Sequence, residues 1–89
     1  MNILISVNFS HPEFKKDFDL SNALLLEHTV LLVTNDIQLN NASNHYDLLI
    51  LGKSTWDKPN FNGKTMDYRV MTKESILDAI QSLWGNIIS

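Results

Sequence analysis

Three short runs of apolar residues predict strands that are buried on both faces. Each run is almost continuously aliphatic rather than alternating, which is typical of strands in a parallel sheet with both faces covered. The runs are Asn2–Asn8, Thr29–Val33 and Tyr46–Leu51, and Gly52 ends the third. A shorter fourth strand is expected at Tyr68–Met71.

A helix start signal follows the first of these strands. The segment Ser10–Glu13 has the Ser-x-x-Glu form of a capping box, in which the two side chains bond each other's backbone N–H groups. The pattern therefore predicts a helix from this box towards Glu27. A second helix start at Asp19 or Ser21 is left open, because polar residues weaken the middle of the segment.

The clearest helical pattern lies at the end of the sequence. Thr72 is a suitable N-cap, and Glu74 is favourable in the first turn of the helix. Apolar residues then recur at helical spacing and form one stripe. The stripe consists of Ile76, Leu77, Ile80, Leu83, Trp84, Ile87 and Ile88.

Two connecting segments are expected to be irregular. Asn35–His45 is rich in asparagine, so a loop with at most one helical turn is expected there. Lys53–Asp67 reads as a long loop, or as a loop with a short helix. Strands that alternate with amphipathic helices predict an α/β fold, here a small four-stranded, mainly parallel sheet flanked by helices. Residues 1–89 are expected to form a single domain.

Composition narrows the class of protein. With 44% apolar and 19% charged residues, the chain is too apolar for intrinsic disorder. It has no cysteine, which excludes disulfides, thiolate catalysis and cysteine-ligated metals. The apolar runs are too short to span a bilayer, and the first residues lead directly into a strand without a basic leader. A cytoplasmic protein is expected.

Catalytic and cofactor-binding motifs are not evident in the sequence. His11, His28 and His45 each stand alone at an expected element boundary, which favours surface or capping roles over metal binding. The sequence contains neither a Gly-x-Ser-x-Gly elbow nor a glycine-rich phosphate loop. The expectation is therefore a protein that is not an enzyme, with no catalytic residues, no metal and no cofactor.

One charge asymmetry remains. Five of the seven basic residues lie in 53–73, where two acids leave a local charge of +3 in a chain of net charge −3. Lysines interleaved with aromatic residues at the carboxyl end of a parallel strand would suit a phosphate or a nucleic-acid strand. The alternative is a solvated charged loop whose Trp56 folds back onto the core. The candidate binding residues are Lys53, Trp56, Lys58, Phe61 and Lys64.

From Gly52 onwards the chain resembles the BRCT domain of bacterial NAD-dependent DNA ligases and related replication proteins. Leu48–Gly52 is similar to that family's third strand, and Asp57-Lys58 stands near its Ser-Lys position. Tyr68–Met71 and the residues after it resemble its last strand and helix. The resemblance implies a strand–helix–strand–strand order, a short helix after the third strand, and a non-catalytic module for protein assembly or DNA contact in replication or repair.

A second, local resemblance is to flavodoxins. Tyr46–Trp56 looks like the flavodoxin third strand and flavin loop, in which the tryptophan stacks on the flavin ring. It implies a flavodoxin-like sheet and, as an alternative function, a small-molecule binder that uses Trp56. A third alternative is a small regulator or inhibitor that acts through a protein–protein surface.

The expected partners follow from these alternatives. We expect a protein partner, with nucleic acid bound through the basic 53–73 segment and no membrane. A homo-oligomer through the C-terminal helix is a further expectation, because Trp84, Ile87 and Ile88 form an apolar end that a chain of this size cannot readily bury.

Overall fold

The fold is built on a four-stranded, fully parallel sheet, as the sequence predicts. The computed structural model describes residues 1–88, with side chains through residue 85. The strand order is β2-β1-β3-β4, with β1 and β3 in the centre. Residue Ile3 pairs with Val30 of β2 and with Leu48 of β3. The strands are β1 Asn2–Ser6, β2 Thr29–Val33, β3 Leu48–Leu51 and β4 Lys64–Asp67.

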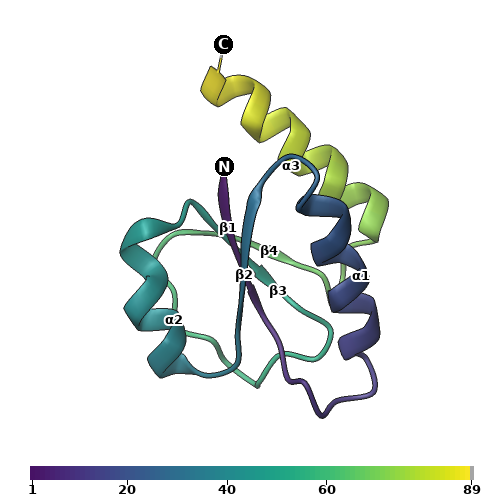
Figure 1. The fold of residues 1–89 in the computed structure, drawn as a ribbon, viewed down its shortest axis with the longest axis vertical. Coiled ribbons are helices and arrows are strands. Elements are labelled where there is room, and N and C mark those ends of the chain that lie inside the picture. The colour runs from purple at the N-terminus through teal and green to yellow at the C-terminus, as the bar shows by residue number, and fades with distance from the viewer. Residues whose placement is uncertain (89) are drawn as a thin grey trace.

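Three helices cover the two faces of the sheet. Figure 1 shows α2 on one side of the strands and α1 and α3 on the other. The helices are α1 Phe14–Leu24, α2 Asp36–Ala42 and α3 Lys73–Ile88, and a 3-10 turn at Ser43–His45 follows α2. No helix among the described residues is both long and apolar enough to cross a membrane.

Alternate side chains of the central strands supply two separate cores. Ile3 and Ile5 of β1, with Leu48 and Ile50 of β3, belong to the larger core under α1 and α3. Leu4, Val33, Leu39 and Leu49 form the smaller core on the α2 face. Because both faces of β1 and β3 are buried, these central strands are almost entirely apolar, which explains their continuous apolar runs.

The first helix begins later than its sequence signal indicates. The Asn8 side chain accepts a hydrogen bond from the Ser10 N–H, and His11 Nδ1 accepts one from the Glu13 N–H, both at 3.0 Å. These local bonds fold residues 8–13 into turns, so α1 starts at Phe14 without a side-chain cap. The predicted capping box is therefore wrong, and the helix ends at Leu24 rather than Glu27.

The asparagine-rich segment after β2 forms a real helix, which corrects the prediction of a loop. Asn35 Oδ1 accepts from the Gln38 N–H at 2.9 Å, and Gln38 Oε1 accepts from the Thr34 N–H at 2.8 Å. This reciprocal arrangement caps α2 in the manner of a capping box. Leu39 then buries completely in the smaller core. The strand–helix–strand–strand order is accordingly wrong, since a helix separates β2 from β3.

The fourth strand lies four residues before its predicted position. In β4 only Met66 is buried, so its sequence lacks the apolar run of the other strands. The residues predicted as the strand instead form a turn, in which the Val70 and Met71 N–H groups donate to the Asp67 carbonyl oxygen. Tyr68 is buried in the larger core from this turn.

Residues 52–63 connect β3 to β4 without a helix, so the short helix implied by the BRCT resemblance is not formed. Trp56 and Phe61 are half-buried and pack against the smaller core, beside α2. The loop therefore covers this face of the sheet, as a helix does in a regular crossover between parallel strands.

The prediction for the last helix is confirmed in its first half. Thr72 Oγ1 accepts from the Ser75 N–H at 3.1 Å, as an N-cap should, and Ile76 and Ile80 are buried. Of the predicted apolar end, Trp84 is half-buried, and the side chains of Ile87 and Ile88 lie outside the described part of the chain.

Candidate functional site

The sheet has one topological switch point, between the carboxyl ends of β1 and β3. The chain leaves β1 through α1 on one face, and it leaves β3 through the 52–63 loop on the other face. Open parallel sheets bind ligands in the crevice that such a divergence creates. Asn8 follows β1 here, and Gly52, Lys53 and Ser54 follow β3.

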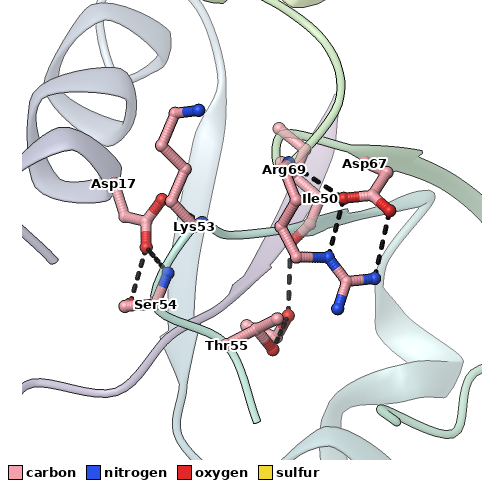
Figure 2. Close-up of polar contacts among 8 residues, drawn as sticks. Asp17, Ile50, Lys53, Ser54, Thr55, Asp67 and Arg69 are labelled. Carbon is pink, nitrogen blue, oxygen red and sulfur yellow. Dashed lines mark hydrogen bonds and ion pairs between the residues drawn. The ribbon is translucent and has the colours of Figure 1, made fainter. Parts of the chain in front are cut away.

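A buried aspartate fills this crevice. Asp17 lies on the inner face of α1 and is completely buried. Its Oδ1 accepts from the Lys53 N–H at 2.7 Å, and its Oδ2 accepts from the Ser54 N–H at 2.8 Å and from the Ser54 hydroxyl at 2.6 Å. Figure 2 shows the carboxylate between α1 and the loop. Successive N–H groups of this kind form a natural anion site, and here the anion is the chain's own carboxylate.

Further hydrogen bonds connect the two strand ends directly. Ser54 Oγ accepts from the Asn8 N–H at 2.9 Å, and the Gly52 N–H donates to the Ser6 carbonyl oxygen at 3.0 Å. The Thr55 hydroxyl donates to Ser6 Oγ at 2.7 Å. The crevice is thus bridged from both sides, and its polar groups are paired with each other rather than offered to a ligand.

Two of the candidate residues, Lys53 and Trp56, lie near the carboxyl edge of the sheet, and both contact other residues of the fold. Lys53 Nζ lies 4.6 Å from the centre of the Tyr68 ring, in a cation–π contact. The Trp56 indole N–H donates to Asp36 Oδ1 of α2 at 3.1 Å, while its ring packs on the smaller core. This arrangement matches the alternative in which Trp56 folds back onto the core.

The other three candidate residues are Lys58, Phe61 and Lys64. Lys64 begins β4 opposite Leu48, at the amino end of the sheet, whereas Lys53 follows β3 at the carboxyl end. Lys58 is exposed in the connecting loop. The Phe61 ring packs on the backbone of Gly63, where an added Cβ would meet it at 2.5 Å. The structure therefore brings Trp56 and Phe61 together on the smaller core, whereas the three lysines lie apart from one another.

The two other basic residues of the segment are paired with carboxylates. Arg69 Nε lies 2.9 Å from Asp67 Oδ1, as Figure 2 shows, and Lys73 Nζ lies 2.7 Å from Asp19 Oδ2. The hydrogen bond that Arg69 donates lowers the pKa of Asp67, and the hydrogen bond that Lys73 donates to Asp19 raises the pKa of Lys73. The local charge of +3 counted along the sequence is consequently not a patch of free cations.

A histidine at the amino end of the sheet contacts the amino group of Met1. The Met1 amino group donates to His28 Nδ1 at 3.1 Å, and the His28 ring meets Trp84 edge to face at 5.8 Å. Burial first, and then the charge of the amino group, lower the pKa of His28. Within residues 1–88 no three His, Asp or Glu side chains gather as metal ligands would.

Asp17 and Ser54, which organise the crevice, were missed by sequence reasoning. A usable signal exists for Asp17, because it shares helical spacing with Leu20, Ser21 and Leu24, which form the buried face of α1. A carboxylate in that row has to be paired. The partner could not be named from the sequence, since the contact joins residues 36 and 37 positions apart.

The two edges of the sheet differ in how they are protected. At one edge β4 carries Lys64 and Asp67, and charged residues are a common protection against unwanted strand pairing. At the other edge β2 has the sequence Thr-Val-Leu-Leu-Val, with no charge and no proline. Leu31 in its centre is 40% exposed, although it lies in a strand of mainly apolar residues. The β2 edge is therefore open to a further strand.

The backbone groups available at this edge follow from the pairing with β1. The Thr29 N–H donates to the Met1 carbonyl oxygen, and the Val33 carbonyl oxygen accepts from the Val7 N–H. Peptide groups alternate in direction along a strand. Those of Thr29, Leu31 and Val33 therefore face β1, and those of Val30 and Leu32 point away from the sheet.

Exposed apolar side chains of α1 lie next to this edge. One flank of α1 faces α3, since Asp19 contacts Lys73 and Ala23 lines a pocket with Leu77 of α3. At 100° per residue, Phe18 and Leu25 lie on the opposite flank, towards β2. They are 49% and 53% exposed. Together with Leu31 they form the β2-edge surface.

Comparison with known proteins adds no relative: no protein-family model, no curated protein and no solved structure matches the chain.

Proposed function

We propose that this chain is a non-catalytic interaction module that acts in protein assembly. The observation that carries the proposal is the β2-edge surface, where an uncharged edge strand with outward-facing peptide groups lies beside Phe18, Leu25 and Leu31. Addition of a strand to an exposed sheet edge is a common mode of protein recognition. The BRCT resemblance would place such assembly in DNA replication or repair.

The crevice at the switch point is filled by the chain's own Asp17, which supports an interaction module over a small-molecule binder. The groups that would orient a substrate or a phosphate in a sheet of this kind are the loop N–H groups after β3. Here they hold the Asp17 carboxylate. A small-molecule function would have to displace a buried ion that accepts three hydrogen bonds.

DNA contact through 53–73 receives less support than protein assembly. Arg69 and Lys73 are in ion pairs, Lys53 lies over Tyr68, and Lys64 is at the far end of the sheet. A phosphate backbone is bound best by several free cations along one groove. Protein assembly at the β2 edge needs no such groove.

An affinity-capture experiment with matched variants tests the proposal. Leu31→Lys puts a charge in the open edge, while Val70→Lys puts one on a side chain that is 81% exposed beyond the opposite edge strand. Circular dichroism checks that both variants fold. We expect wild type and Val70→Lys to capture the same proteins, added copies of the chain included, and Leu31→Lys to lose them. Identical capture by all three would remove the β2 edge from the interface.

A further inference from the structure

We infer that the partner at the β2 edge is a second copy of this chain, joined by antiparallel pairing of β2 with β2 around a two-fold axis at Leu31. This inference rests on the proposed function and specifies its partner. The pairing would join two four-stranded sheets into one continuous sheet of eight strands.

The hydrogen-bonding groups at the edge are self-complementary for this arrangement. The peptide groups of Val30 and Leu32 face outward, and these residues stand symmetrically on either side of Leu31. In an antiparallel pair centred on Leu31, Val30 of each copy lies opposite Leu32 of the other. Each such pair exchanges two N–H···O=C bonds, and Leu31 forms the close, non-hydrogen-bonded pair between them.

The α2 side of the strand offers space for the leucine of the second copy. An open groove of about 430 Å³ runs beside the strand, lined by Leu31, Val33 and Gln38 among others. Directly opposite residues of an antiparallel pair have Cβ atoms about 4.5–5.5 Å apart, and non-hydrogen-bonded pairs lie at the short end of this range. Leu31 of each copy would therefore pack against its equivalent and lie over this groove, which removes the exposed leucine from water.

The other face of the sheet brings the two copies of α1 together. Strands lie about 4.8 Å apart, so helices that cover β1 and β2 in each copy would be about 10 Å apart across the axis. That is the usual separation of packed helices. Their facing flanks carry Phe18 and Leu25, and the two helices run antiparallel. Apolar side chains therefore meet across the axis on this face of the sheet.

A single engineered thiol tests the two-fold axis directly, because the chain has no cysteine of its own. In Leu31→Cys the two thiols would be close enough for a disulfide, which needs Cβ atoms about 3.5–4.5 Å apart. Val70→Cys, at the other side of the sheet, is the matched control. Under mild oxidation we expect Leu31→Cys to form covalent dimers roughly tenfold faster or more, because the paired strands raise the local thiol concentration. Equal rates for the two variants would overturn the inference.

Sedimentation and hydrogen exchange separate this inference from the proposed function. We expect wild type and Val70→Lys to dimerise with increasing concentration, Leu31→Lys to stay monomeric, and the Val30 and Leu32 amides to gain exchange protection in the dimer. A dimer in which these two amides stay unprotected uses another surface and contradicts the inference. If the chain stays monomeric yet still captures other proteins in a Leu31-dependent way, the second copy is wrong and the protein-assembly function remains. If neither dimer nor capture is found, both fail.

Discussion

The Asp17 carboxylate occupies the space that a side chain at Gly52 would need. A Cβ atom added to Gly52 would lie 2.7 Å from Asp17 Oδ2 and 2.5 Å from the Ser6 carbonyl oxygen. The glycine is therefore required by its contacts with a helix residue and a strand residue, and its backbone angles are ordinary. The buried carboxylate at position 17 thus depends on the absence of a side chain at position 52.

Alanine at two glycines should accordingly have opposite effects. Gly52→Ala forces Ser6 and Asp17 apart, and we expect a loss of about 1–3 kcal/mol in the free energy of unfolding. Gly85→Ala places a methyl group where no atom lies within 4 Å, in a helix, and should stabilise by about 0.5–1 kcal/mol. Urea unfolding of both variants measures this. A neutral Gly52→Ala would contradict the crevice geometry.

Removal of the buried carboxylate should be far more costly than removal of an exposed one. Asp17→Ala leaves two N–H groups and one hydroxyl without a partner in a buried place, so we expect a loss of about 3 kcal/mol or more. Asp19→Ala on the same helix breaks a surface ion pair and should cost less than about 1 kcal/mol. Chemical denaturation compares the two. Similar losses would mean that Asp17 does not hold the loop.

His28 should make the folded state less stable in mild acid. Its pKa is lowered in the folded state, chiefly by burial, from the ordinary value of 6.5. The unfolded chain then binds the proton more readily, so the contribution is complete above pH 6.5 and is lost as the pH falls below it. In His28→Gln the amide oxygen can still accept from the Met1 amino group without titrating. We expect the unfolding midpoint of wild type to fall more between pH 7.5 and 5 than that of the variant, and parallel decreases would refute the assignment.

DNA binding through the basic segment should be weak and unlocalised. Its cations are paired or dispersed, so a titration with 5′-phosphorylated duplex DNA should give no set of amide shifts confined to 53–73. The double variant Lys58→Ala, Lys64→Ala should behave like wild type. Salt-sensitive shifts confined to that segment, abolished in the double variant, would restore nucleic-acid contact as the function.

Three of the four strands and the first half of the last helix could be predicted, because local pattern determines them. β1 and β3 are buried on both faces and β2 carries a similar apolar run, so all three are visible without any knowledge of their neighbours. The position of β4 is not visible in the sequence, because this edge strand has only one buried residue, Met66. The asparagines of α2 disfavour a helix, and its cap, formed by Asn35 and Gln38, outweighs that local preference.

The candidate site was predicted less well, for a physical reason. Basic residues that are close in the sequence need not share one surface. The 52–63 loop returns the chain to the amino end of the sheet, where β4 begins, and this separates Lys53 from Lys64. The network around Asp17 joins residues 36 and 37 positions apart, and no local pattern encodes such a contact. The β2 edge became visible only with the strand order.

Two residues of the 52–63 loop donate hydrogen bonds to the same carboxylate oxygen of α2. Asp36 Oδ1 accepts from the Trp56 indole at 3.1 Å and from the Asn60 N–H at 3.2 Å. Asp57 and Lys58 between them are exposed. Extra chain inserted there would begin and end at nearly the same point, and each doubling of a flexible loop costs only about 0.6 kcal/mol. The fold thus offers a permissive position for a fluorescent or affinity label.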